Sequence, residues 1–281
     1  MDEWPTVRVT ADRETGGDIV WAPTWLEEVD STQLELKRRW AQRPDLAPGT
    51  VFAARRQTAG RGRHGRAWIS GVNRNLCFSL LWPLAPDGPP AAAATLAAAL
   101  AVDDLLQARG IPSRPKWPND VLVGERKICG ILAEILPGEP AALALGIGLN
   151  VNLEAEALTA IGRPATSMRE ETGQVYDLPP LLEEALRALT PWLSRWARLG
   201  FAGLRVAWEL RSQSLGQPIG IHQGADLVRG RVAGYGPAGE LLLETAPGRV
   251  QAIWSGEIVE PGAGAVNRTV AGGVHESMAG P

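Results

Sequence analysis

The sequence predicts an α+β protein with a mixed sheet, followed by a small all-β unit. Three apolar segments follow one another between residues 121 and 151, as the strands of one sheet do. Two helical stretches flank them: an alanine-rich one at 91–109, and one at 178–211 whose leucines recur at helical spacing. Beyond Gln217 the pattern changes to short strands separated by glycine turns, which is typical of a small antiparallel barrel.

Composition and charge narrow the classes of function. The 281 residues are 45% hydrophobic and 21% charged, an ordinary globular mixture, and the net charge of −3 offers no general basic field for DNA or an anionic membrane. The longest apolar stretch, 91–102, is shorter than the roughly 20 residues that span a bilayer, and the acidic N-terminus lacks the layout of a secretory signal. Cys77 and Cys129 lie in apolar runs and read as free thiols. We therefore expect a cytoplasmic protein that binds neither DNA nor membranes.

The N-terminal half begins with a strand expected at 19–29. It runs into Asp30-Ser31-Thr32-Gln33, which precedes a helical pattern through Trp40. Such a cluster predicts a helix start at which a side-chain oxygen of the cluster accepts from the free N–H groups of the first turn. The next elements expected are a strand at 49–54, a loop at 57–66 closed by Trp68, and a buried strand at 75–82.

The second half continues with the three apolar strands, at 121–123, 128–136 and 141–151, the first two joined by a hairpin at 124–126. The helical stretch that follows should break near Gly200. Strands of the small unit are expected at 219–221, 226–233, 240–244 and 250–259. These elements predict a main domain at 18–213, a small barrel at 214–261, and a disordered tail at 262–281, where no run could form a core.

A glycine loop interleaved with cations, GRGRHGR at 60–66, predicts an anion site. Glycines let backbone N–H groups approach an anion, and arginines add charge-assisted hydrogen bonds to carboxylate or phosphate oxygens. By itself the motif fits a solvated basic loop or a nucleic-acid contact at least as well. It matches neither the P-loop nor the dinucleotide-binding glycine pattern.

Three further motifs lie next to the apolar strands. Lys116-Trp117-Pro118-Asn119-Asp120 places a cation, an amide and a carboxylate just before a strand, although Pro-Asn-Asp is also ordinary turn chemistry. RKICGIL at 126–132 starts with two cations and becomes a buried strand, and GIGLNVN at 146–152 fits a glycine-bearing strand. Each of these motifs taken singly has a purely structural interpretation.

In combination, the motifs resemble those of the biotin protein ligases, which adenylate biotin and attach it to a carboxylase lysine. The resemblance covers about residues 25–259 and rests on DSTQ at 30–33, QTAGRGRHGRAW at 57–68, KWPND at 116–120, RKICGIL at 126–132, GIGLNVN at 146–152 and SGEI at 255–258. It implies a catalytic domain of the biotin/lipoate protein ligase type with a small C-terminal Src-homology-3-like β-barrel. Gln33 departs from the pattern, since many members have asparagine there.

The implied reaction brings the carboxylate of biotin to the α-phosphorus of ATP, so the site must cancel the repulsion of two anions. Lys127 is the first candidate for a catalytic residue and Arg63 the second, because their cations would stabilise oxyanion charge. By resemblance the biotin site is lined by Ser31, Thr32, Gln33, Gln57, Arg61, Gly62, Arg63 and Lys127. The candidates for binding ATP are Trp68, Lys116, Asn119 and Asn150, with Asp120 in a supporting role.

The resemblance also implies ATP and biotin as substrates, Mg²⁺ to neutralise the phosphates, and a biotin carboxyl carrier protein or domain as acceptor. No ligand cluster in the sequence identifies protein ligands for Mg²⁺, and monomer and homodimer are both left open. Two alternatives are a lipoate-protein ligase and a biotin-sensing regulatory binding protein. The residues before Ser31 show no helix-turn-helix pattern, so direct binding to DNA is not expected.

Overall fold

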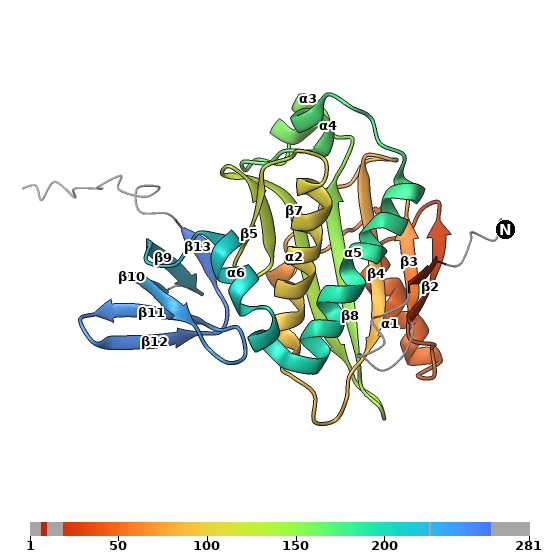
Figure 1. Cartoon of the computed structure of the whole chain (residues 1–281). Coiled ribbons are helices and arrows are strands. Elements are labelled where there is room, and N and C mark those ends of the chain that lie inside the picture. Colours follow the sequence, from red (N-terminus) through yellow and green to blue (C-terminus); the bar gives the residue numbers. More distant parts are fainter. Residues whose placement is uncertain (1–6, 10–18, 225, 260–281) are drawn as a thin grey trace, which may run out of the picture.

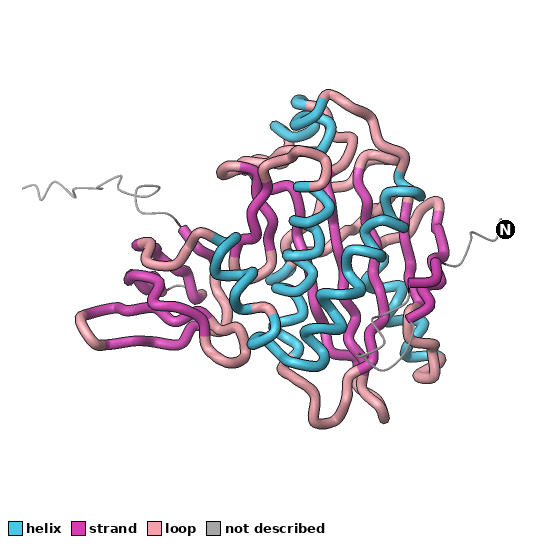
Figure 2. Tube along the Cα trace, in the orientation of Figure 1, coloured by secondary structure: helices cyan, strands magenta, loops and turns pink. Residues whose placement is uncertain are grey.

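The computed structural model describes residues 7–9, 19–224 and 226–259, which form two sheets and the helices that pack on the larger one (Figures 1 and 2). The strands of the larger sheet are β1 (Val7–Val9), β2 (Ile19–Leu26), β3 (Thr50–Ala54), β4 (Asn75–Pro83), β5 (Ser113–Lys116), β6 (Asp120–Val123), β7 (Arg126–Leu136) and β8 (Ala142–Asn150). The helices are α1 (Thr32–Gln42), α2 (Ala94–Gln107), α3 (Ala155–Thr159), α4 (Met168–Thr172), α5 (Leu178–Leu199) and α6 (Arg205–Ser212). The smaller sheet contains β9 (Pro218–Gln223), β10 (Asp226–Tyr235), β11 (Leu241–Ala246), β12 (Arg249–Ile253) and β13 (Glu257–Val259).

The larger sheet has the order β1-β2-β3-β4-β8-β7-β6-β5. Strands β2 and β3 pair in parallel, whereas the central strands β4, β8 and β7 pair antiparallel, so the predicted mixed sheet is confirmed. Strand β5 was not expected from the sequence. It reads Ser-Arg-Pro-Lys, without apolar alternation, and it lies at the edge of the sheet, where a proline and charged side chains are tolerated.

The two faces of this sheet pack against different helices (Figure 1). Along β4, Leu76, Phe78 and Leu80 join the large core beneath α2 and α5, while Leu81 packs under α1 in a second, smaller core. Successive side chains of a strand point to opposite faces, so Cys77 and Ser79 share the α1 face with Leu81. On β8 the same alternation places Gly146 and Gly148 on the α1 face, opposite Ser79 and Cys77. The face that carries α1 is therefore the one on which β4 and β8 present small residues, namely Cys77, Ser79, Gly146 and Gly148.

The start of α1 differs from the prediction. Ser31 occupies the N-cap with an extended backbone, but its side chain makes no capping hydrogen bond. Instead, the Thr32 N–H donates to Gln57 Oε1 at 2.8 Å, so a side chain from the segment just before the glycine loop replaces the expected local cap. This contact holds the first turn of α1 against the loop.

The C-terminal part follows the expected break at Gly200, whose φ of 60° ends α5. Beyond α6, the smaller sheet has the order β12-β11-β10-β9-β13 and its strands pair antiparallel. The prediction of one strand over 250–259 was wrong: β12 ends at Ile253, and β13 pairs with β9 on the far side of the sheet. At Gly256 the chain turns with a φ of 155°, and a Cβ there would lie 2.3 Å from Ile221.

The described part of the chain contains no helix that is both long and apolar enough to cross a bilayer. Cys77 and Cys129 are buried free thiols, as expected, and burial raises the pKa of Cys77 to about 12. The expected tail at 262–281 lies outside the described residues. The domain boundary near 214 and the Src-homology-3-like form of the small sheet stay predictions.

Candidate active site

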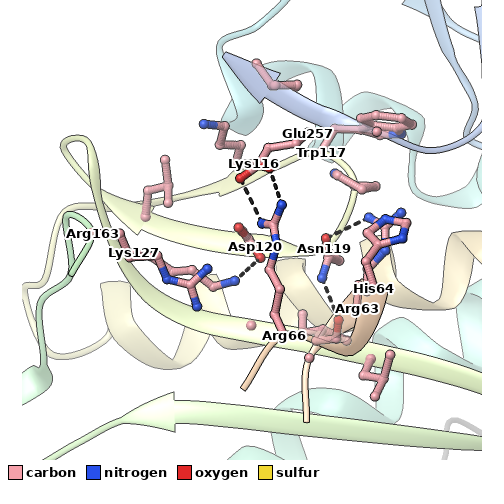
Figure 3. Close-up of a pocket in the computed structure, with 18 of the residues that line it drawn as sticks. Arg63, His64, Arg66, Lys116, Trp117, Asn119, Asp120, Lys127, Arg163 and Glu257 are labelled. Carbon is pink, nitrogen blue, oxygen red and sulfur yellow. Dashed lines mark hydrogen bonds and ion pairs between the residues drawn. The ribbon is translucent and has the colours of Figure 1, made fainter. Parts of the chain in front are cut away.

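A cavity of about 430 Å³ lies between the two sheets, enclosed by the glycine loop, the 116–120 segment, β7 and β13 (Figure 3). Many of the residues singled out in the sequence line it: Gly62, Arg63, Trp68, Lys116, Asn119, Asp120 and Lys127. The lining also includes Arg66, Arg163 and Glu257, which sequence reasoning had not selected. The loop that carries Arg163 has no motif, whereas Glu257 lies in the quoted SGEI segment.

Lys127 is held from two sides. Its Nζ lies 2.5 Å from Asp120 Oδ1 and 5.7 Å from the centroid of the Trp68 ring. Its backbone N–H donates to the carbonyl of Pro164 at 3.0 Å, and its own carbonyl accepts from Thr166 at 3.0 Å. The lysine side chain is 17% exposed, so the cation reaches the cavity from a fixed, largely enclosed position.

Arg63 is positioned by an asparagine of the second motif. Its Nη1 donates to Asn119 Oδ1 at 3.0 Å, and Asn119 Nδ2 donates to the carbonyl of Ile131 at 2.7 Å (Figure 3). Burial lowers the pKa of the Arg63 guanidinium, while the nearby charge of Asp120 acts in the opposite direction. A guanidinium stays charged in proteins, so the loop places a second cation, besides that of Lys127, on the wall of the cavity.

The position of the Trp68 ring accounts for two of the glycines in the sequence motifs. A Cβ on Gly148 would lie 2.5 Å from Trp68 Cε2, and a Cβ on Gly130 would lie 3.0 Å from Trp68 Cζ3. The half-buried indole therefore packs directly against the backbone of β8 and β7, where any larger residue would displace it. Its Nε1 is buried and has no hydrogen-bond partner among the described residues.

Four residues expected in the biotin site form a separate buried cluster on the same face of the sheet, next to Trp68. They are Ser31, Thr32, Gln33 and Gln57, and none is among the residues that line the cavity. Gln57 Oε1 accepts from the backbone N–H and the hydroxyl of Thr32, at 2.8 and 3.2 Å, and Thr32 Oγ1 lies 3.0 Å from Ser79 Oγ. Gln33 extends over Gly146. We call Thr32, Gln33, Gln57 and Ser79 the polar patch.

The two remaining candidates lie outside the cavity. Arg61 is exposed on the glycine loop, where its backbone bridges to Ala67. Asn150 is buried: its Oδ1 accepts from Asn75 Nδ2 at 2.9 Å, and its Nδ2 donates to the carbonyl of Thr166 at 2.9 Å. It borders a second hollow of about 260 Å³ that Trp68 also lines. Asn150 thus fixes the segment whose backbone pairs with Lys127.

The smaller sheet supplies one wall of the cavity through residues 256–259. Arg66 of the glycine loop forms a two-pronged ion pair with Glu257 of β13, with Nη1 donating to Oε1 at 2.8 Å (Figure 3). The hydrogen bonds from Arg66, with smaller contributions from the charges of Arg163 and Lys116, hold the pKa of the Glu257 carboxyl below its ordinary value. The loop and the second sheet are therefore joined across the mouth of the cavity.

A second link between the sheets comes from the 116–120 segment. Trp117 is buried, and its Nε1 donates to the carbonyl of Gly239 at 3.1 Å. The carbonyl of Pro118 accepts from Thr95 Oγ1 of α2 at 2.9 Å. Lys116 and Asp120, at the ends of the segment, are thereby fixed relative to both sheets.

Within residues 7–9, 19–224 and 226–259, no three His, Cys, Asp or Glu side chains gather closely enough to hold a metal ion. More cationic than acidic side chains line the cavity. The arrangement is suited to a reaction in which anionic groups meet and negative charge develops.

Comparisons with known proteins point to one family. Residues 25–152 match the model of the biotin/lipoate A/B protein ligase family. The biotin–acetyl-CoA-carboxylase ligase of Paracoccus denitrificans is 35% identical over 245 residues, which are 83% of this chain and 98% of that protein. The bifunctional ligase/repressor BirA of Escherichia coli is 30% identical over 247 residues, 86% of this chain and 74% of that protein. The solved structure of the biotin protein ligase from Aquifex aeolicus in complex with biotin and ATP matches with a TM-score of 0.70 at 32% identity, covering 84% and 97% of the two chains.

Proposed function

The chain belongs to the biotin/lipoate A/B protein ligase family, and on that premise we propose that it is a biotin protein ligase. It activates biotin with ATP to biotinyl-AMP and transfers the biotin to a specific lysine of a biotin carboxyl carrier domain. The observation that carries this proposal is the cavity between the sheets, where Arg63 and Lys127 present fixed cations beside Trp68. The chain is similar over most of its length to a ligase solved with biotin and ATP.

In the first step an oxygen of the biotin carboxylate attacks the α-phosphorus of ATP, and pyrophosphate leaves. Negative charge builds up on the oxygens around phosphorus, and cations already held in place stabilise it without reorganising. Lys127 and Arg63 meet this requirement, because Asp120 and Asn119 hold them in the empty protein. Lys127 is therefore the leading catalytic residue and Arg63 the second.

In the second step the amine of the acceptor lysine attacks the biotinyl carbonyl, forming the amide bond and releasing AMP. The carbonyl oxygen gains negative charge, which Lys127 is placed to stabilise again. We assign Asp120 to the orientation of Lys127, since its Oδ1 contacts Nζ directly. A carboxylate that holds a catalytic ammonium keeps it from turning towards solvent.

For ATP, we propose that the ring of Trp68 receives the adenine and that Lys116 contacts the phosphates. Asn119 and Asn150 act indirectly, because the amide groups of both are engaged by the protein: Asn119 fixes Arg63, and Asn150 fixes the segment paired with Lys127. Mg²⁺ enters as part of the nucleotide substrate. The described residues provide no cluster of ligands for a resident ion, and Asp120 is occupied by Lys127.

The polar patch, with Ser31 beside it, is proposed to receive the ureido ring of biotin, whose N–H groups and carbonyl need partners in a buried site. This observation favours biotin over lipoate, since the dithiolane ring of lipoate has no N–H or carbonyl to pair with these side chains. Gly62 and Arg61 of the loop complete the proposed biotin site.

Three further points belong to the proposal. Both cysteines are buried free thiols, which suits the reducing cytoplasm. The partner is the biotin carboxyl carrier protein or domain that receives biotin. The absence of DNA binding stays a prediction, and the choice between monomer and homodimer stays open. A regulatory protein that only senses biotin would bind it without turning over ATP.

The test is ATP-dependent transfer of biotin to a purified carrier domain. Lys127→Ala should lower the rate about 100- to 1,000-fold, the usual effect of losing one group that stabilises oxyanion charge. Arg187→Ala removes a cation from an exposed pair on α5, far from the cavity lining, and should leave the rate within about twofold. Labelling with lipoate instead of biotin would favour the lipoate alternative. Absence of both labelling and ATP turnover would refute the ligase proposal.

A further inference from the structure

Gln33 of the polar patch carries an unmatched hydrogen-bond acceptor. Its side chain is 4% exposed, and its Nε2 donates to Glu134 Oε2 at 3.0 Å and to the carbonyl of Ala144 at 3.1 Å. Its Oε1 is buried and has no partner among the described residues. A buried polar atom without a partner is rare in folded proteins, and a bound water or ligand can supply the missing partner.

The orientation of this amide is dictated by its neighbours. The carbonyl of Ala144 can only accept, and Glu134 does the same because its other oxygen lies 2.8 Å from Lys37 Nζ. Burial alone would raise the pKa of Glu134, but hydrogen bonds from Lys37 and Gln33 outweigh it, so the pKa lies below its ordinary value and the carboxyl is ionised. Two acceptors at one end of an amide require its NH₂ group there, which sends Oε1 towards Gly146.

The polar patch has no hydroxyl hydrogen left for this oxygen. Thr32 Oγ1 donates to Gln57 Oε1, so the contact between Thr32 Oγ1 and Ser79 Oγ uses the hydrogen of Ser79. A Cβ on Gly146 would lie 2.7 Å from Gln33 Oε1 and 3.3 Å from Ser79 Oγ, so both oxygens lie over the same glycine. The donor for Gln33 Oε1 therefore does not come from a hydroxyl of the polar patch, and an N–H group of a bound substrate can supply it.

We propose that Glu134 is a positioning residue for substrate selection: by holding Gln33 Nε2, it commits Gln33 Oε1 to accept a hydrogen bond from one ring N–H of the substrate. The inference rests on the proposed function, in which that ring is the ureido ring of biotin. Replacing the correct N–H by an oxygen atom would bring two acceptors together without changing the size of the ring. A site built around a hydrogen bond rejects such an analogue far more strongly than a merely apolar pocket does.

The experiment measures kcat/KM for pyrophosphate exchange with biotin and with two analogues, each having oxygen in place of one ring N–H. The wild type should disfavour one of the two analogues by at least about 100-fold, because a buried acceptor would be left facing an acceptor. In Glu134→Gln, the new amide can donate to Gln33, so only the carbonyl of Ala144 still holds the Gln33 amide in its original orientation, and the turned orientation becomes accessible. For the disfavoured analogue, the ratio of kcat/KM with biotin to kcat/KM with the analogue should fall at least about tenfold. For the other analogue this ratio should stay unchanged. Gln33→Met, whose thioether sulfur is only a weak acceptor, should show the same selective loss.

The control is Glu183→Gln on α5, which removes a carboxylate from an exposed ion pair and should preserve all three rates. If Glu134→Gln lowers kcat/KM for all three ligands by the same factor, Glu134 is merely structural and the inference is wrong. A wild type that accepts both analogues as well as biotin would also overturn it. If the wild type shows no biotin-dependent exchange, the proposed function fails and this inference fails with it. Thermal unfolding of each variant confirms that the protein is folded.

Discussion

Replacing Gly148 by alanine should displace the indole of Trp68. The new Cβ would lie 2.5 Å from Trp68 Cε2 and 2.8 Å from both Cζ2 and Nε1, whereas carbon atoms pack at about 3.5–4.0 Å. The ring must therefore retreat by roughly 1 Å. Overpacking of this kind costs about 1–3 kcal/mol, and alanine recovers about 0.5–1 kcal/mol relative to glycine in a strand. A net loss of about 1–2 kcal/mol follows.

A double-mutant cycle with Trp68→Leu isolates this contact. The smaller side chain leaves room for the new methyl group, so Gly148→Ala should stabilise the Trp68→Leu protein by about 0.5–1 kcal/mol, the gain of alanine over glycine in a strand. The coupling free energy should equal the overpacking cost of about 1–3 kcal/mol, measured by denaturant unfolding of the four proteins. For Gly148→Ala alone, the melting temperature should fall by about 2–8 °C and the KM for ATP should rise, since the proposed adenine platform has moved. Equal destabilisation in both backgrounds would show that the contact with Trp68 is not the reason for the glycine.

Two further predictions concern stability. Hydrogen bonds from Arg38 hold the pKa of Asp30 at about 2, so the stability that this exposed pair provides is present above the ordinary value of 3.8 and is lost as the pH falls towards 2. Asp30→Asn should therefore lower the free energy of unfolding by at most about 1 kcal/mol at neutral pH, and urea unfolding of the two proteins should converge near pH 2. Trp117→Phe leaves the carbonyl of Gly239 without its donor and should lower the free energy of unfolding by about 1–2 kcal/mol. Unchanged stability together with an unchanged KM for ATP would contradict the assigned link between the sheets.

Local patterns were sufficient to predict most of the fold. The apolar runs of β4 and β8 were visible because strands buried on both faces are apolar throughout, and the leucine spacing of α5 was visible because burial of one helix face imposes a period on the sequence. Strand β5 has no such period, because an edge strand of four residues with a proline has little to bury. At the start of α1 the sequence indicated a capped helix end, but not which side chain bonds to its N–H groups. The Thr32 N–H donates to Gln57, which lies 25 residues further along the chain.

The site was predictable to the extent that its chemistry lies in contiguous motifs. Lys127, Arg63 and Asp120 belong to such motifs, and the structure brings them to one cavity. Glu134 and Glu257 were not selected, because a charged residue within a strand normally indicates a solvent-facing position. Only the packing of α1 on the sheet, and of one sheet beside the other, shows that these two carboxylates contact Gln33 and the glycine loop.

The wall that β13 adds to the cavity has a consequence for biosynthesis. Every other residue that lines the cavity lies between 62 and 164, whereas residues 256–259 leave the ribosome after α5 and α6 have been made. Nascent domains fold from the N-terminal side during synthesis, so the larger sheet can form while Arg66 still has no Glu257 to bind. A nascent chain at this stage lacks one wall of the cavity. The lining is therefore complete only in a chain that includes β13.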